Sequence, residues 1–292
     1  MNEASLQASW PPQLRDPKGM RGQYRQGGRP VQEADRQASG FTMVMDKGLG
    51  SHAFGDLLEV AGPYMDCIKL GFGTSVLYDE QLLQEKLAAA RRHGILVMPG
   101  GTLLEAAVSQ QVAGAFFDAV CAAGFSAVEV SDGTIELDRR RRSELIAEGV
   151  KRGLRVFTEY GKKSEGSAIE AIELARTVEA DIRAGADLVI VEARESGLNI
   201  GLFDERGECR EGVLEAAAAA VRELGDVLWE APLKTQQNQL LTRFGPGVHL
   251  GNIAPGDCVA LEAMRRGLRS DTFVAPVDAS ANQSSDGYIY VI

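Results

Sequence analysis

Eight short apolar runs, each followed by a polar or helix-forming stretch, most limit how this chain can fold. The runs are rich in β-branched residues, as buried parallel strands are. They lie at residues 41–46, 65–71, 94–100, 125–132, 154–161, 186–194, 226–232 and 247–252. Alternation of strands with helices predicts parallel strands that are joined by crossover helices.

The stretches between the runs have helical spacing, most clearly at residues 79–94 and 168–185. Four glycines each stand between such a stretch and the next run, where a left-handed residue commonly ends a helix: Gly94, Gly124, Gly153 and Gly185. Eight such units predict an α/β fold, a closed eight-stranded (β/α)₈ TIM barrel. A doubly wound open sheet is the alternative, but its GxGxxG turn is absent after the first run.

Composition divides the chain into three segments. Residues 1–40 are rich in Pro, Gly, Gln and Arg and poor in aliphatic residues, so we expect a flexible N-terminal arm. Residues 41–275 are expected to form the catalytic barrel, and residues 276–292 a C-terminal tail. An Arg-rich organellar presequence is the alternative for the arm, but its four acidic residues count against that interpretation.

Charge, hydropathy and cysteine spacing argue against a nucleic-acid-binding, a membrane-spanning and a secreted protein. The net charge of −10 argues against a nucleic-acid-binding surface. The absence of a long apolar run argues against a membrane span, and the polar N-terminus against a secretory signal. Four cysteines lack paired spacing and three lie in apolar segments, so reduced, buried thiols are expected. We therefore expect a cytoplasmic protein.

Polar side chains follow every run at its carboxyl end, which is where a TIM barrel carries its chemistry. They include Asp46, Lys47, Lys69, Glu105, Glu129, Asp132, Glu159, Lys162, Lys163, Glu192, Arg194, Glu230, Lys234 and Asn252. Carboxylates inside apolar runs are rarely buried unless they are paired or bound to a metal. We therefore interpret Glu129, Glu192 and Glu230 as parts of a polar barrel mouth, with a structural ion-pair network as the alternative.

Acids and bases around one pocket suggest a division of roles. Lysine and arginine would hold a phosphate or carboxylate group, and carboxylates would hold Mg²⁺. A lysine with a lowered pKa would transfer a proton to or from carbon. The residues alone therefore predict an anionic substrate and a carbanion or enolate intermediate.

Ten motifs in order resemble the phosphosulfolactate synthase family. They are DKG (46–48), KLGFGTS (69–75), PGGTLLE (99–105), EVSDG (129–133), TEYGKK (158–163), VEARESG (191–197), GLFDERG (201–207), EAPLKTQQ (230–237), HLGNI (249–253) and MRRGLRSDTF (264–273). The resemblance covers residues 41–273. One departure is HLGN in place of an NLAN-like motif, which is expected to put a titratable group, His249, near the rim.

The resemblance implies a Mg²⁺-dependent, Michael-type addition of sulfite to phosphoenolpyruvate, an early step of coenzyme M biosynthesis. The partners would be small anionic substrates, with no nucleic acid and no membrane, and a homo-oligomer is expected because such barrels often self-associate. Lys163 is our candidate for the proton donor and Lys162 is its rival. The candidates for substrate binding are Lys47, Lys69, Arg194, Lys234 and Asn252. The candidate metal ligands are Glu159, Glu192 and Asp132.

Two other functions stay open on the sequence. One is a Schiff-base lyase or aldolase on the same barrel, with Lys162 or Lys163 as the nucleophilic amine. The other is a non-catalytic, stress-related barrel protein, because the family includes plant heat-stress-associated relatives. Polar side chains at all eight strand ends argue against the second, since a scaffold does not need them.

Overall fold

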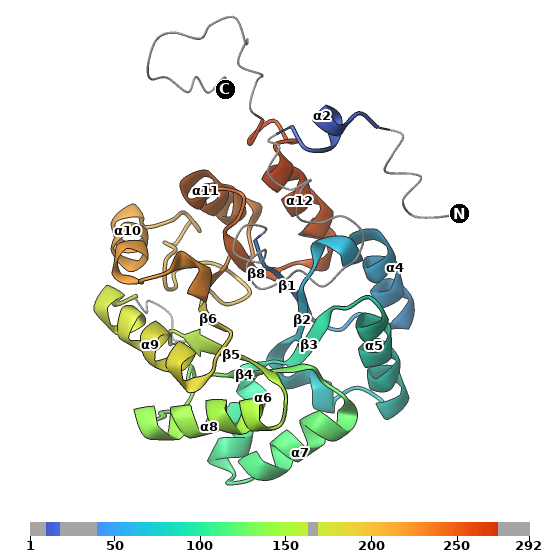
Figure 1. Cartoon of the computed structure of the whole chain (residues 1–292), viewed down its shortest axis with the longest axis vertical. Coiled ribbons are helices and arrows are strands. Elements are labelled where there is room, and N and C mark those ends of the chain that lie inside the picture. The colour runs from blue at the N-terminus through green and yellow to red at the C-terminus, as the bar shows by residue number, and fades with distance from the viewer. Residues whose placement is uncertain (1–9, 18–39, 163–168, 274–292) are drawn as a thin grey trace, which may run out of the picture.

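The computed structural model describes residues 10–17, 40–162 and 169–273. Strands and helices alternate along the chain around one sheet (Figure 1). The strands are β1 (Thr42–Asp46), β2 (Cys67–Leu70), β3 (Leu96–Pro99), β4 (Ala127–Val130), β5 (Arg155–Tyr160), β6 (Leu188–Val191), β7 (Val227–Glu230) and β8 (His249–Ile253). Each overlaps one of the eight predicted runs, so all eight predicted strands are confirmed.

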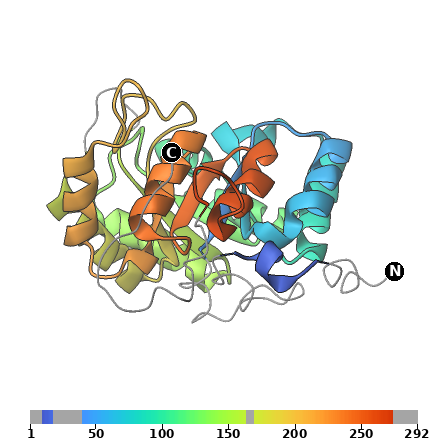
Figure 2. The same cartoon turned by 90° about the horizontal axis from the view of Figure 1, so that it is seen from above.

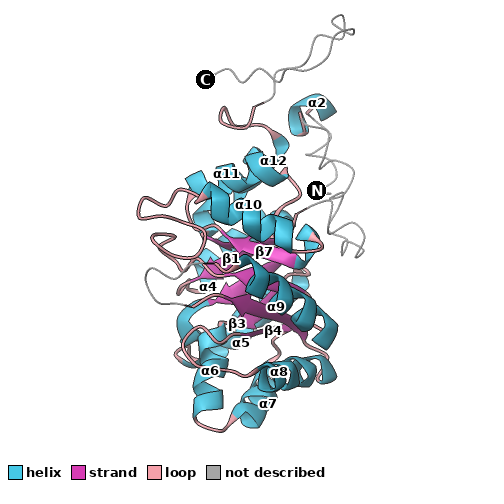
Figure 3. Ribbon diagram, turned by 90° about the vertical axis from the view of Figure 1, so that its left-hand side faces the viewer, coloured by secondary structure: helices cyan, strands magenta, loops and turns pink. Residues whose placement is uncertain are grey.

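Helices surround the strands, cyan outside magenta in Figure 3. The α-helices are α2 (Pro12–Arg15), α4 (Ser51–Ala61), α5 (Glu80–Arg92), α6 (Gly101–Ser109), α7 (Ala113–Ala123), α8 (Arg139–Lys151), α9 (Ala171–Ala184), α10 (Glu211–Ala220), α11 (Lys234–Phe244) and α12 (Cys258–Arg266). Short 3₁₀ helices are η1 (Gly62–Tyr64), η2 (Gly71–Val76), η3 (Leu224–Asp226) and η4 (Pro255–Asp257). The four glycines predicted to end helices all have φ between 69° and 110°, as expected for left-handed residues.

The sheet closes almost completely. Its strands are parallel and run in the order β3-β2-β1-β8-β7-β6-β5-β4. Between β3 and β4 the link is shorter: Ser126 N donates to Val97 O at 3.2 Å, and Val97 N donates to Ser126 Oγ at 2.9 Å. This order confirms the predicted (β/α)₈ barrel and excludes the doubly wound open sheet.

Side chains from the strands fill the barrel interior. Phe41, Met43, Cys67, Met98, Ala127, Phe157, Leu188, Ile190 and Leu228 form this interior cluster, which is separate from the larger core beneath the helices. Gly251 on β8 leaves the space for them, since a Cβ atom there would lie 2.3 Å from Leu228 Cδ2. Side chains alternate across a strand, so a residue two positions after a member of this cluster also points inward.

The amino-terminal end of the barrel is closed by His249 and Arg265. Arg265, fully buried on α12, donates from Nη1 to Val248 O at 2.8 Å and to Pro246 O. His249 Nδ1 accepts from Phe41 N at 2.8 Å. The expectation that His249 lies near the rim is wrong, because it is the first residue of β8 and therefore lies at the opposite end of the barrel.

The first and last parts of the described chain meet on one side, where in Figure 2 the red α12 lies beside the blue early elements. There Arg266 Nη1 donates to Arg15 O at 3.2 Å. The predicted arm and tail fall almost wholly outside the described residues. Within the parts that are described, no helix combines the length and apolarity needed to cross a membrane.

All four cysteines are free, as predicted. Cys67 and Cys258 are buried and Cys209 is half-buried. Cys121 is exposed, so the expectation of burial is wrong for this residue, which faces outward on α7.

Candidate active site

Five charged side chains meet inside the barrel at its carboxyl end. They are Lys69 on β2, Glu129 on β4, Glu159 on β5, Glu192 directly after β6 and Glu230 on β7. Each stands two residues after a member of the interior cluster, so the alternation of the strand turns it inward. Each is 5% exposed or less. The local sequence pattern therefore places five charges in a space that is otherwise apolar.

Lys69 joins three of these glutamates. Its Nζ lies 2.9 Å from Glu129 Oε1, 3.4 Å from Glu159 Oε2 and 3.4 Å from Glu230 Oε1. Backbone amides hold the carboxylates from the other side. Gly101 N donates to Glu129 at 3.3 Å, Ala193 N to Glu230 at 2.9 Å, and Arg194 N to Glu192 at 2.5 Å.

Two glycines allow this close approach. A Cβ atom at Gly101 would lie 2.3 Å from Ser131 Oγ and 3.2 Å from Glu129 Cδ, so any other residue would displace the Ser131 side chain and crowd the Glu129 carboxylate. A Cβ atom at Gly161 would lie 2.8 Å from Glu192 Cβ, and its φ of +130° also favours glycine. The glycines of the PGG and TEYGKK motifs therefore have a steric role beside the site.

The five buried side chains combine one ammonium group with four carboxyl groups. Burial, followed by the nearby carboxylates of Glu159 and Glu230, raises the pKa of Glu192 to about 11. Burial also raises the pKa of Glu230, and Lys69 opposes that shift. Burial alone would lower the pKa of Lys69, but the carboxylates of Glu129, Glu230 and Glu159 together raise it well above its usual range. Lys69 is therefore a cation, and a further cation would balance the group.

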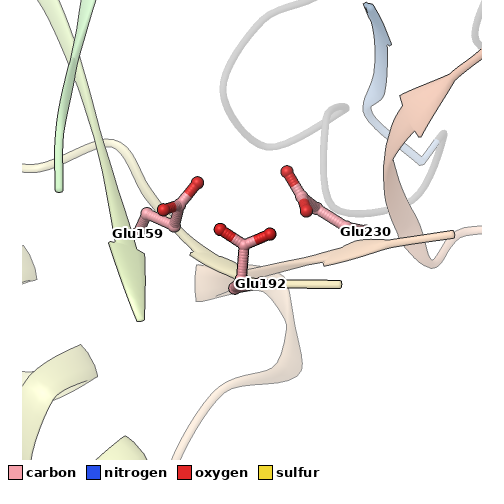
Figure 4. A group of neighbouring side chains, drawn as sticks. All are labelled: Glu159, Glu192 and Glu230. Atoms are coloured by element: carbon pink, nitrogen blue, oxygen red, sulfur yellow. The ribbon is translucent and has the colours of Figure 1, made fainter. Parts of the chain in front are cut away.

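A divalent metal ion fits this arrangement. Glu159, Glu192 and Glu230 each offer an oxygen atom, and these atoms all lie within 4.8 Å of one another. Figure 4 shows the three carboxylates, from neighbouring strands, turned toward one space. Carboxylate oxygens are the ligands that Mg²⁺ prefers. The structure thus brings the predicted ligands Glu159 and Glu192 together and adds Glu230.

Asp132, the third predicted ligand, is not part of that group. Its Oδ1 accepts from Arg142 Nη1 at 3.1 Å. The reason is its position: Glu129 and Ser131 stand on the inward face of the chain after Ala127, whereas Asp132 stands on the other face. This parity was available in the sequence, and it would have favoured Glu230 over Asp132.

A cavity of about 370 Å³ opens at the carboxyl ends of β1 and β8. Its lining includes Met45, Lys47, Gly48, Leu49, Glu195, Pro232, Asn252, Ala254 and Pro255. Asn252 is 4% exposed and its Nδ2 donates to Arg194 O at 3.3 Å. Its Oδ1 has no hydrogen-bond partner within the described chain. Lys47 and Asn252, two predicted substrate-binding residues, therefore share one cavity.

The other predicted substrate-binding residues are placed differently. Lys69 lies deep among the glutamates and does not line this cavity. Arg194, with a φ of +57°, contributes its backbone to the site and has an exposed side chain. Lys234 Nζ lies 3.0 Å from Asp257 Oδ1 at the start of α11.

Of the two predicted catalytic lysines, the structure describes Lys162 but not Lys163. Lys162 Nζ donates to Asp132 O at 2.8 Å and to Ile135 O at 3.2 Å, so it crosses to the loop after β4. It also lines a second cavity, of about 480 Å³, together with Asp132. Lys163 lies outside the described residues.

A buried ion pair shapes the first loop of the mouth and was missed from the sequence. Lys86 on α5 is 1% exposed, and its Nζ lies 2.5 Å from Asp46 Oδ2 and 2.8 Å from Leu49 O. Asp46 Oδ1 accepts from Gly48 N and Leu49 N, both at 2.8 Å. The ion pair and these hydrogen bonds thus fix the turn that carries Lys47. Lys86 lies beside Leu87 and four residues before Ala90, so its place on the buried helix face was a usable signal.

The fold and the site together define a (β/α)₈-barrel enzyme, with its charged groups at the carboxyl ends of the strands. Comparison with known proteins gives the family. The family model described as (2R)-phospho-3-sulfolactate synthase (ComA) matches residues 30–271. The phosphosulfolactate synthase of Methanocaldococcus jannaschii is 41% identical over 236 residues, which cover 80% of this chain and 94% of that protein.

The phosphosulfolactate synthase of Methanothermobacter thermautotrophicus is 40% identical over 245 residues, 83% of this chain and 95% of that protein. The chain therefore belongs to the phosphosulfolactate synthase family, a family of lyases that form a carbon–sulfur bond, and the predicted resemblance is confirmed. The crystal structure of the YdjI aldolase from Escherichia coli K12 has a TM-score of 0.50 and 13% identity, over 80% of this chain and 82% of that one. That likeness shows the barrel fold alone.

Proposed function

We propose that the protein catalyses the Mg²⁺-dependent, Michael-type addition of sulfite to phosphoenolpyruvate, which gives (2R)-2-O-phospho-3-sulfolactate. The observation that carries this proposal is the convergence of Glu159, Glu192 and Glu230 beside Lys69. The names of the relatives, all phosphosulfolactate synthases, support it. Substrates with several negative charges suit a site that combines a place for a metal ion with basic side chains at its rim.

The chemistry follows from the structure of phosphoenolpyruvate, whose carboxylate is conjugated with its double bond. The sulfur of sulfite attacks the methylene carbon, and the electron pair of the double bond moves toward the substrate carboxylate. Negative charge therefore develops there during the reaction. Mg²⁺, held by Glu159, Glu192 and Glu230, would supply electrostatic stabilisation of that charge.

The chain's own residues bind, orient and protonate the substrate. Lys47 and Asn252 line the cavity and would hold its anionic and polar groups. Lys69 keeps the buried glutamates in place through its three contacts. The ammonium of Lys163 gives a proton to the phosphate-bearing carbon, which completes the product. Lys162 is a poorer proton donor for this step, because its ammonium group already donates hydrogen bonds to two backbone carbonyl groups.

The test is an assay of the purified full chain with Mg²⁺, sulfite and phosphoenolpyruvate. We expect a sulfonated phosphoester detectable by ³¹P NMR and mass spectrometry, and its loss on addition of EDTA. Product formation without any divalent ion, or no product from folded protein, would overturn the proposal. Light scattering on the same sample tests the expected homo-oligomer.

The two lysines give a matched pair of variants for the proton-transfer step. We expect Lys163→Ala to lower kcat about 100-fold or more, in the range for loss of a general acid. Lys162→Ala should change it by less than about fivefold, because the hydrogen bonds of Lys162 within the described residues go to the loop after β4. Full activity of Lys163→Ala would refute this role. Trapping of a substrate on either lysine by borohydride would instead favour the Schiff-base alternative.

A further inference from the structure

Arg142 lies behind the mouth of the barrel, on α8, yet it contacts two strand ends that carry site residues. Its Nη2 donates to Glu159 O at 2.8 Å, and its Nη1 donates to Asp132 Oδ1 at 3.1 Å. The side chain is 3% exposed. A single planar guanidinium group thus ties the end of β5 to the chain that follows β4.

The hydrogen bond to Glu159 O takes the place of a strand-to-strand hydrogen bond, because β4 ends before it could supply a donor. Tyr160 O accepts from Glu192 N, so it faces β6. Carbonyl groups alternate along a strand, so the Glu159 carbonyl faces β4. β4 ends at Val130, and its register pairs Val130 with Thr158, one residue before Glu159. Without Arg142 this buried carbonyl group would lose its donor, and such a loss is costly in a protein interior.

Asp181 fixes the orientation of Arg142. It is fully buried on α9, where its Oδ1 accepts from Arg142 Nε at 3.2 Å and its Oδ2 accepts from Arg142 Nη2 at 2.7 Å and from Nε at 2.9 Å. Arg139 also contacts Asp181 from the solvent side. Two parallel hydrogen bonds define the plane of a guanidinium group, which a lysine does not reproduce.

We propose that Arg142 is a positioning residue for the carboxylate site and that Asp181 orients it. By holding the backbone of Glu159, Arg142 sets the place of the Glu159 carboxylate relative to Glu192 and Glu230. The effect is indirect, because Arg142 contacts the strand end and not the space between the three glutamates. This inference rests on the proposed function in that Glu159 is taken as a metal ligand.

The same strand offers a matched control. At the opposite end of β5, Arg155 Nε donates to Asp187 Oδ1 at 2.7 Å, and Asp187 Oδ2 accepts from Val156 N at 2.9 Å. This pair also joins an arginine to an aspartate and to the backbone of β5, but it lies at the amino-terminal end of the strand. A purely structural role predicts equal effects of the two pairs on the site.

The experiment measures binding of Mn²⁺, without substrate, to the full-length protein by the loss of the free Mn²⁺ signal in electron paramagnetic resonance. We expect Arg142→Lys to weaken Mn²⁺ binding about 10- to 100-fold, the usual range for groups that orient metal ligands. Arg155→Lys should change it by less than about threefold. Equal Mn²⁺ affinities for the two variants would overturn the positioning role.

A second variant covers the case that Arg142→Lys does not fold. Asp181→Asn keeps the size of the side chain and leaves Arg142 in place but without its orienting charge. We expect Mn²⁺ binding about tenfold weaker than wild type, with Asp187→Asn as its control, and unchanged binding would overturn the proposal. Failure of wild type itself to bind Mn²⁺ would instead remove the metal site, and with it both the proposed function and this inference.

Discussion

At the carboxyl end of the barrel Lys69 faces the carboxylates of Glu129, Glu159 and Glu230, whereas at the amino end Arg265 faces backbone carbonyl groups. Both cations are almost completely buried. At the amino end Nη1 of Arg265 meets two neutral acceptors that the fold already provides. At the carboxyl end four carboxyl groups face one ammonium, and oxygen atoms of three of them lie within 4.8 Å of one another.

This difference separates a region that stabilises the fold from one that is kept for chemistry. Hydrogen bonds from a buried arginine to carbonyl groups remove unsatisfied polar atoms and contribute to stability. Crowded carboxylates cost stability unless a cation joins them, and enzymes commonly accept such a cost at their active sites. Substitutions at the two ends should therefore have opposite effects on activity and on stability.

The largest effect is expected at the carboxyl end, for Glu192→Gln. The substitution removes a candidate metal ligand, so we expect kcat/KM to fall about 100- to 1000-fold, as when one electrostatic group of a site is lost. Without metal the Glu192 carboxyl, with its pKa raised to about 11, must take up a proton on folding at neutral pH, whereas a glutamine needs none and its oxygen still accepts from Arg194 N. The melting temperature without metal should therefore rise by a few degrees. Kinetics and thermal unfolding check this, and a less stable or fully active variant would contradict the comparison.

A smaller effect, of the opposite kind, is expected at the amino end for Arg265→Met. The carbonyl groups of Pro246 and Val248 lose their donor, so we expect a loss of about 3 kcal/mol in the free energy of unfolding. The kcat of the folded fraction should stay within about twofold of wild type, because the site lies at the other end. Denaturant titration and kinetics measure both quantities. Arg243→Met, at an exposed ion pair with Glu215, should cost less than about 1 kcal/mol.

The fold could be predicted from the sequence because its signal is local and repeated. Each strand is a short run of β-branched residues, and glycines such as Gly124 and Gly185 separate it from the preceding helix. Each predicted run began one or two residues before its strand, and the runs 125–132 and 186–194 also included the polar residues that follow. Those residues belong to the loops of the mouth, as at the end of the run 125–132.

The site could be predicted only in part, for reasons of geometry. Strand alternation marks Glu159, Glu192 and Glu230 as inward, and the adjacency of β5, β6 and β7 brings them together. The hydrogen bonds between Arg142 on α8 and Asp181 on α9 join residues that are 39 positions apart in the sequence. Neither residue stands at a strand end. No local pattern predicts such a contact, since it depends on how α8 and α9 pack.

A smaller, pH-dependent effect than that of Arg265→Met is expected for His249 at the amino end. Burial, followed by the charge of Arg265 and opposed by that of Asp66, lowers the pKa of His249 from 6.5 to about 4. Folding therefore requires a neutral imidazole, whose Nδ1 accepts from Phe41 N. The unfolded chain takes up a proton below about pH 6.5 and the folded chain does not, so this stability is present above pH 6.5 and declines toward pH 4.

Replacing His249 by asparagine, the residue of the NLAN-like motif, tests this pH dependence. The asparagine oxygen can still accept from Phe41 N, but the ring contact with Phe41 is lost, so we expect about 1 kcal/mol lower stability at pH 7. Between pH 7 and pH 5 the wild type should lose about 2 kcal/mol more than His249→Asn, which reverses their order of stability. Urea unfolding at several pH values measures the difference. Parallel pH profiles would mean that His249 takes up a proton in the folded protein as readily as in the unfolded chain, and that the amino end, like the carboxyl end, can hold an unbalanced charge.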